Sequence, residues 1–161
     1  MGSLRIPADL VADMRAHGEK TFPDECCGAL IQDAEGRLRI RRCKNIQNDL
    51  HRDDPEKHPR DARTAYFIDP KELLAVTREV DEVGGEIAVL YHSHPDHAAY
   101  FSAEDRARAV IEEWNEPIYP DAAYVVVSVM GGEAGDMKAF VWDDDTREYI
   151  EKAVEPGEES A

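Results

Sequence analysis

The sequence predicts an α/β fold in which one mixed sheet is flanked by helices. Runs of apolar and β-branched residues alternate with helical patterns, and short turns join some of the strand runs into hairpins. The chain has 161 residues and is 42% hydrophobic, which is enough for one domain with a sizeable core. We therefore expect a single domain over residues 1–150, followed by an acidic, disordered tail over residues 151–161.

The first part of the chain predicts a helix and a hairpin. Pro7 suits a first helical position and Gly18 a helix exit, which places a helix over Pro7–His17. Residues 27–32 form a short apolar run, and residues 38–43 alternate apolar and basic side chains. The turn sequence at 33–36 would join these two strands as a hairpin.

A long polar connection separates this hairpin from the next pattern. Residues 48–64 are charged and contain two prolines, which is typical of a segment that is functional or mobile. Residues 65–68 then predict a strand. Asp69 suits a helix N-cap and Pro70 the first helical position, and the Gly84-Gly85 pair marks the helix end.

The last part of the chain predicts a central strand, a helix and two further strands. The strand over Glu86–Tyr91 is almost continuously apolar, as a strand buried on both faces would be. We expect a helix over Ser102–Trp114, with Trp114 facing inward. Strands over 122–130 and 138–142 complete the predicted sheet.

The charge of the chain restricts its partners. Acidic residues number 35 against 19 basic residues, and the net charge is −16. A surface this negative repels phosphate backbones, so we expect no nucleic-acid partner. No apolar run approaches the roughly 20 residues of a membrane span, and no signal core begins the chain. We expect a cytoplasmic protein with no membrane partner.

The three cysteines predict neither a disulfide framework nor a zinc knuckle. Cys26 and Cys27 are adjacent, and Cys43 stands apart, so no Cys-x-x-Cys pair exists. This pattern agrees with a reducing compartment. A Cys-His nucleophile is a weak alternative, because neither Cys26 nor Cys27 has an activating partner nearby in sequence.

The strongest functional pattern is a metal-ligand set after the central strand. Residues i and i+2 of a strand point to one side, so His92 and His94 can aim at one point. Asp105, at the start of the next predicted helix, is a third candidate ligand. Catalytic zinc takes three protein ligands and keeps one position for water. The pattern predicts one zinc ion per chain.

Each of these residues also has an ordinary structural role. A His-x-His pair is common, and Pro95 marks a strand exit. Asp105 would be favoured at a helix start by the helix dipole. Ser102 is a natural N-cap, with Asp105 at near capping-box spacing. The spacing alone leaves both interpretations open.

The set His92-Ser93-His94-Pro95, Ser102 and Asp105 resembles the His-x-His-x(10)-Asp motif of the JAMM, or MPN-plus, metalloproteases. Upstream, Pro23-Asp24-Glu25-Cys26-Cys27-Gly28 is similar to the Pro-x-Glu-x-Cys-Gly element of that family. The resemblance covers the chain from about Leu4 to about Trp142. It implies a curved mixed sheet between helices, with the α-β-α layering of cytidine deaminases.

The resemblance also implies roles for individual residues. His92, His94 and Asp105 would bind zinc, and Glu25 would be the general acid/base. Asp24 is the alternative base, although Glu25 is in register with the family motif. Ser102 would donate a hydrogen bond to the oxyanion. The chain departs from its relatives at His97 and in the 48–64 insert, which puts substrate choice in doubt.

The family hydrolyses amide or isopeptide bonds after the C-terminal glycines of ubiquitin-like proteins. The small prokaryotic members resemble processing enzymes for sulfur-carrier proteins, and we expect a partner of this kind. Two alternatives remain: a non-catalytic scaffold or binding module, and a zinc amidohydrolase acting on small-molecule amides. A homodimer is an alternative to the monomer.

Overall fold

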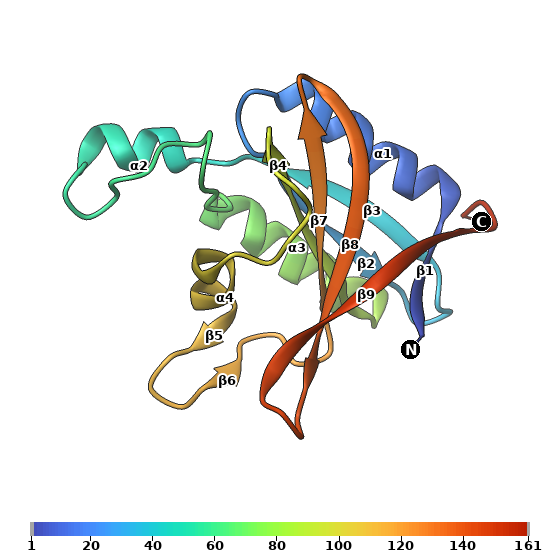
Figure 1. Ribbon diagram of the computed structural model, residues 1–161. Coiled ribbons are helices and arrows are strands. Elements are labelled where there is room, and N and C mark those ends of the chain that lie inside the picture. The colour runs from blue at the N-terminus through green and yellow to red at the C-terminus, as the bar shows by residue number, and fades with distance from the viewer. Residues whose placement is uncertain (1, 161) are drawn as a thin grey trace.

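The computed structural model describes residues 2–160, and its centre is a seven-stranded mixed sheet (Figure 1). The strand order is β1-β9-β8-β7-β4-β2-β3. The strands of this sheet are β1 (Ser3–Pro7), β2 (Cys27–Gln32), β3 (Leu38–Cys43), β4 (Glu86–Pro95), β7 (Ala123–Met130), β8 (Glu133–Asp143) and β9 (Glu148–Gly157). The helices are α1 (Ala8–Thr21), α2 (Gln47–Asp53), α3 (Pro70–Val83) and α4 (Ala103–Ala109).

Strand β4 lies inside the sheet, between β7 and β2. It pairs in parallel with β7 and antiparallel with β2. The parallel pairs β4–β7 and β1–β9 stand among antiparallel neighbours, so the sheet is mixed, as predicted. The free edges of the sheet are β1 and β3.

Helix α1 covers one face of the sheet (Figure 1). Its buried side chains Leu10, Val11 and Met14 pack with alternate residues of β7 and β4, among them Val125 and Tyr91. The helix begins at Ala8, one residue later than predicted, with Pro7 as its N-cap, and it passes through Gly18 to Thr21 instead of ending at His17. A Cβ at Gly18 would lie 3.0 Å from Val129, so this glycine allows close packing of the helix on the sheet.

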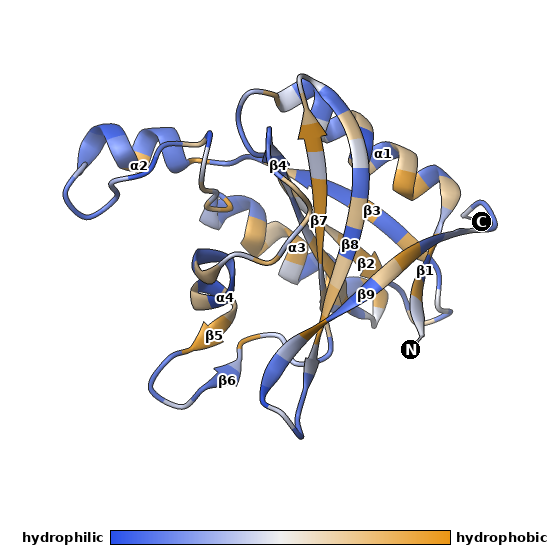
Figure 2. Cartoon of the chain, viewed as in Figure 1, coloured by the Kyte–Doolittle hydropathy of each residue, from blue (hydrophilic) through white to orange (hydrophobic). Residues whose placement is uncertain are grey.

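Helices α3 and α4 lie over the opposite face (Figure 1). Leu90, Tyr124 and Val126 form the core there, because they alternate with the residues that face α1. Figure 2 shows that β7, at the centre, is almost continuously hydrophobic. His92 and His94 share the face of Leu90 and therefore point toward α3 and α4.

The predicted hairpin and the second predicted helix are confirmed. Strands β2 and β3 span 27–32 and 38–43 and pair antiparallel. Asp69 caps α3 by accepting a hydrogen bond from the Lys71 N–H, and Pro70 opens the helix. Gly84 ends it in the left-handed conformation, with φ of 63°, which glycine adopts without a Cβ clash.

Two predicted elements are wrong. Residues 65–68 form a single bridge between Ile68 and Asn45 instead of a strand, because the Asn45 side chain bonds the Phe67 N–H and the Ala65 carbonyl. The helix expected over Ser102–Trp114 ends at Ala109. The β-branched pair Val110–Ile111 forms β5, which pairs with β6 (Glu116–Pro117), and Trp114 on the connecting turn is 66% exposed.

The expected disorder of residues 151–161 is wrong up to Gly157. Residues 148–157 form β9, which pairs with β8 on one side and with β1 on the other. Tyr149 anchors the strand by packing against Phe101, Tyr124 and Trp142. The acidic composition of the tail hides this pattern, because the charged side chains occupy the exposed positions of a paired strand.

The insert over 48–64 contains helix α2, which projects away from the sheet (Figure 1) and is hydrophilic throughout most of its length (Figure 2). Its return segment runs back toward the carboxyl end of β4. Among residues 2–160, no helix is both long and apolar enough to cross a membrane.

Candidate metal centre

His92 and His94 lie at the end of β4, on one face of the strand as the sequence predicted, and the strand runs on to Pro95 instead of ending at Tyr91. Because they are two residues apart on one strand, both imidazoles project from the same face. His92 is fully buried and His94 is 5% exposed. The Nε2 atoms of the two rings lie 3.3 Å apart.

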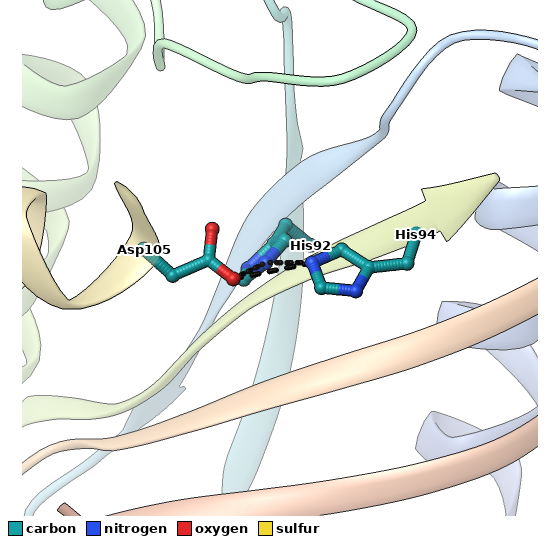
Figure 3. Close-up of side chains that lie close together, drawn as sticks. All are labelled: His92, His94 and Asp105. Atoms are coloured by element: carbon teal, nitrogen blue, oxygen red, sulfur yellow. Dashed lines mark hydrogen bonds and ion pairs between the residues drawn. The ribbon is translucent and has the colours of Figure 1, made fainter. Parts of the chain in front are cut away.

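Helix α4 brings Asp105 to the same point (Figure 3). Its Oδ2 lies 3.1 Å from Nε2 of His92 and 3.1 Å from Nε2 of His94. The same oxygen accepts a hydrogen bond of 3.0 Å from the Ser102 backbone N–H. Burial alone would raise the pKa of Asp105, but the charges and hydrogen bonds of the two histidines outweigh burial and lower it.

The geometry of these three atoms fits a metal ion. Their separations of 3.1, 3.1 and 3.3 Å describe a nearly equilateral triangle. Tetrahedral zinc with ligand bonds of about 2.0 Å separates its ligand atoms by about 3.3 Å. All three residues are buried, and three acceptor atoms that converge in this way suit a cation. The group could therefore hold a metal ion.

The surroundings of the imidazoles fix their orientation. Nδ1 of His94 lies 3.0 Å from the Ala98 carbonyl, which can only accept, so Nδ1 carries a proton, and in the neutral ring Nε2 presents the lone pair. The His92 ring stacks on Tyr66 with centroids 4.4 Å apart. Nδ1 of His92 has no hydrogen-bond partner among the described residues. Both rings are thus held with Nε2 toward Asp105.

Glu25 comes close to the metal centre through the register between β2 and β4. Cys27 pairs with His92, and the Cys26 carbonyl accepts from the Ser93 N–H, so the next residue back, Glu25, lies near His94. Glu25 and His94 line one small pocket of about 80 Å³. This register explains a proximity that sequence separation conceals.

The Glu25 carboxyl group is buried in an environment that disfavours its charge. Its side chain is 4% exposed, and Oε1 has no hydrogen-bond partner within residues 2–160. Burial, and then the negative charge of Asp105, raise the pKa of Glu25 to about 9. A buried carboxyl group with a raised pKa beside a candidate metal centre is typical of a general acid/base. Asp24, the alternative base, is half-buried, and its side chain accepts from Asn48.

Three contacts hold the backbone of the Glu25 segment. Ser93 faces α1, away from the histidines as predicted, and its Oγ accepts a hydrogen bond of 2.8 Å from the Cys26 N–H. The Glu25 N–H donates to the Ala62 carbonyl at 2.7 Å. The Asn45 side chain donates to the Glu25 carbonyl at 2.9 Å. The insert is therefore part of the frame of the site.

Asn45 uses all four of its side-chain hydrogen bonds in this frame. Nδ2 donates to the carbonyls of Glu25 and Ala65, and Oδ1 accepts from the N–H groups of Gln47 and Phe67. The hydrogen bonds from Asn45 to the Ala65 carbonyl and from the Phe67 N–H to Asn45 hold the residues on either side of Tyr66, whose ring stacks on His92. One side chain thus positions both the Glu25 segment and the residue that packs against a candidate ligand.

Ser102 is the N-cap of α4, as predicted, in a full capping box with Asp105. Its Oγ accepts from the Asp105 N–H at 3.0 Å, and the hydroxyl proton remains available as a donor. Ser102 also lines the pocket that contains Glu25 and His94. The cap and an oxyanion contact can therefore use the same hydroxyl group through different atoms.

The pocket also contains residues that the sequence did not indicate as site residues. Arg60 and Thr64 from the insert and Tyr100 from the loop before α4 line it, together with His97. The sequence did not show whether His97 and the 48–64 insert come near the site, and in the structure both contribute residues to the pocket. No spacing rule connects Arg60 with His94, since a long irregular segment separates them.

The cysteines do not form a nucleophilic site. All three are buried as free thiols. Burial raises the pKa of Cys26 to about 12 and the pKa of Cys43 to about 11, and it raises the pKa of Cys27 as well. Cys27 packs in the core behind Glu25, as predicted. Thiols held protonated in this way are poor nucleophiles.

Comparison with known proteins gives matches over most of the chain. Residues 7–143 match the family of prokaryotic homologs of the JAB domain. The CysO-cysteine peptidase of Mycobacterium tuberculosis is 34% identical over 137 residues, which are 85% of this chain and 81% of that protein. The desampylase of Haloferax volcanii is 29% identical over 133 residues, which are 83% of this chain and 80% of that protein.

Solved structures show the same fold. A protein from Desulfitobacterium hafniense matches with a TM-score of 0.68 at 22% identity, and the match covers 97% of this chain and 94% of that one. The family match includes strand β4 with both histidines and helix α4 with Asp105, and it confirms the resemblance seen in the motifs. The chain therefore belongs to the family of prokaryotic homologs of the JAB domain.

Proposed function

We propose that the protein is a zinc-dependent metallopeptidase that hydrolyses the amide or isopeptide bond after the C-terminal glycines of a ubiquitin-like or sulfur-carrier protein. The observation that carries the proposal is the buried triangle of His92, His94 and Asp105 with the Glu25 carboxyl group in the adjoining pocket. Zinc held by these three residues would supply Lewis acidity and lower the pKa of a water to about 7.

The residues of the chain have distinct tasks in this proposal. Glu25 accepts a proton from the attacking water and delivers it to the leaving amine. The proton acceptor must be ionised, and a cation held by Asp105 and the histidines would favour this, because it would offset the Asp105 charge that helps to raise the pKa of Glu25. Ser102 donates its hydroxyl proton to the oxyanion that develops on the substrate carbonyl.

The names of the relatives support a substrate of this class. The similar proteins are a CysO-cysteine peptidase, a desampylase and, from Thermus thermophilus, a probable TtuB-protein conjugate cleaving protease at 30% identity over 114 residues. A non-catalytic scaffold is less well supported, because the three candidate ligands and Glu25 are all present and lie together.

The test is a mass-spectrometric cleavage assay with the zinc-loaded protein. Its substrates are a sulfur-carrier protein joined through its C-terminal glycine to an amino acid, the same carrier joined to a lysine side chain, and small acyl-glycine amides. The proposal expects a product with the mass of the free carrier. Cleavage of the small amides alone would instead identify an amidohydrolase, and cleavage of none would support the scaffold.

A further inference from the structure

A basic side chain from the insert lies in the same pocket as the candidate acid/base. Arg60, between α2 and α3, lines the pocket with Glu25, Thr64 and His94. The Arg60 side chain is 53% exposed, so a solute entering the pocket can reach it.

The two contacts of Arg60 that involve its side chain occupy only part of its guanidinium N–H groups. Its Nε lies 2.7 Å from Glu104, and its Nη1 donates to the Thr64 carbonyl at 3.4 Å. Glu104 also pairs with Arg108 at 3.2 Å, so two guanidinium groups share one carboxylate, and the three groups together carry one net positive charge. A guanidinium has five N–H donors and binds carboxylates in a planar, bidentate manner.

The position of Glu25 shows which part of a substrate would meet Arg60. Glu25 must lie within hydrogen-bond reach of the leaving amine to protonate it, so that amine enters the shared pocket. In an amino acid, the α-carboxylate is attached to the same carbon as the amine. It would therefore lie beside the amine in a pocket of about 80 Å³ whose other lining residues include Arg60 and His97. A lysine side chain would place apolar methylenes there.

We propose that Arg60 binds the α-carboxylate of the leaving group. Arg60 is then a specificity-determining residue that favours a leaving group with a free α-carboxylate over a lysine side chain. This inference rests on the proposed function and specifies its substrate. In the reaction, the C–N bond breaks and the hydroxyl of water goes to the glycine carbonyl carbon. The proton passes through Glu25 to the amine, and the amino acid departs from Arg60.

The competing explanation is that Arg60 only fastens the insert to α4 through Glu104. Glu104→Gln separates the two roles, because it breaks that ion pair and keeps the guanidinium. A purely structural contact predicts that Arg60→Gln and Glu104→Gln have the same effect on every substrate. Carboxylate binding predicts that only Arg60→Gln changes the discrimination between substrates with and without the carboxylate.

The experiment compares two conjugates of one ubiquitin-like sulfur-carrier protein that ends in Gly-Gly. One carries alanine as the free acid, and the other carries alaninamide, so they differ only in the leaving-group carboxylate. With zinc-loaded wild-type protein, we expect kcat/KM to be about tenfold higher for the free acid, as for loss of one hydrogen bond to a charged group. The ratio should fall toward one in Arg60→Gln and persist in Glu104→Gln.

A binding measurement makes the test independent of turnover. Calorimetry of both conjugates with Glu25→Gln, and with Glu25→Gln combined with Arg60→Gln, should show a preference for the free acid only while Arg60 is present. Equal cleavage of both conjugates by the wild type, or a preference that survives Arg60→Gln, would overturn the inference. Cleavage of neither conjugate would count against the proposed function, and the binding comparison would still decide the role of Arg60.

Discussion

The carboxylate oxygen of Asp105 that accepts from the Ser102 backbone N–H is the same Oδ2 that lies 3.1 Å from both imidazoles. The capping box of α4 therefore orients the third candidate ligand. Ser102 completes the box through its hydroxyl, which accepts from the Asp105 N–H. The start of this helix and the geometry of the metal centre depend on one reciprocal contact.

Ser102→Ala is expected to lower kcat by about 10²–10³-fold if the hydroxyl is an oxyanion donor. It should also cost about 1 kcal/mol of stability through the lost cap. Ser102→Gly is the matched control, since glycine caps nearly as well but has no hydroxyl. Both variants should be similarly slow in a turnover assay. If the rate of Ser102→Gly stays close to that of the wild type, the hydroxyl is only a helix cap.

Asp105→Asn is expected to weaken zinc binding while it keeps an oxygen for the capping box. The amide lacks the negative charge that pairs with a cation, but its carbonyl still accepts from the Ser102 N–H. Metal analysis after zinc repletion should give about one zinc per wild-type chain and much less for the variant. Addition of zinc should raise the melting temperature of the wild type, because it binds the folded state. Absence of zinc in the repleted wild type would contradict the ligand assignment.

The chelated protein should lose stability as the pH rises from about 7 to about 9. The folded-state pKa of Glu25, about 9, lies above its ordinary value of 4.5, so the folded state holds a proton that the unfolded state has released. His17 acts in the opposite direction at lower pH, since burial lowers its pKa from 6.5 to about 4. Urea unfolding between about pH 7 and pH 8 isolates Glu25, because above that range the three buried thiols, whose pKa values are also raised, add to the loss. The slope should flatten in Glu25→Gln, and an unchanged slope would assign it to another group.

Asn45→Ala is expected to reduce turnover more than it reduces zinc content. The variant leaves the Glu25 and Ala65 carbonyls and the N–H groups of Gln47 and Phe67 without their partner. An unpaired group costs about 1–3 kcal/mol where it is buried and less where water can reach it. The positions of Glu25 and Tyr66 should loosen as a result. Stability, zinc content and kcat should be measured on the same preparation.

Asn115→Ala provides a comparison for Asn45→Ala. Asn115 lies on the β5–β6 hairpin after α4, and its side chain accepts from Arg106 and donates to the Arg147 carbonyl. Asn115→Ala should lower the melting temperature with little effect on kcat at temperatures where the protein is folded. An equal loss of kcat in both variants would show that Asn45 acts only through general stability.

Elements whose ends are set by residues close in sequence could be predicted from the sequence. Helix α3 has a cap at Asp69, a proline at its first position and a left-handed Gly84, so its bounds are set locally. Strand β9 and residues 65–68 were mispredicted because distant partners decide them. Strand β9 depends on pairing with β8 and β1, and residues 65–68 bond instead to the Asn45 side chain.

In the candidate site, too, residues close together in sequence could be predicted and residues brought in by distant contacts could not. His92, His94 and Asp105 lie close in sequence, so strand alternation and a helix start were enough to suggest them. Glu25 came from the family resemblance, and the structure explains its place by the pairing of Cys27 with His92. Arg60 had no sequence signal, because its position depends on the path of the returning insert.

In the proposed reaction, Glu25 moves the proton while His92, His94 and Asp105 hold the metal. The most direct measurement is zinc content and turnover of a carrier conjugate on the same sample of Glu25→Gln. We expect about one zinc per chain, as in the wild type, and no detectable turnover, because the variant removes the proton acceptor without removing a ligand. A Glu25→Gln protein that retains its zinc and cleaves the conjugate at the wild-type rate would contradict the role of Glu25 as the proton acceptor.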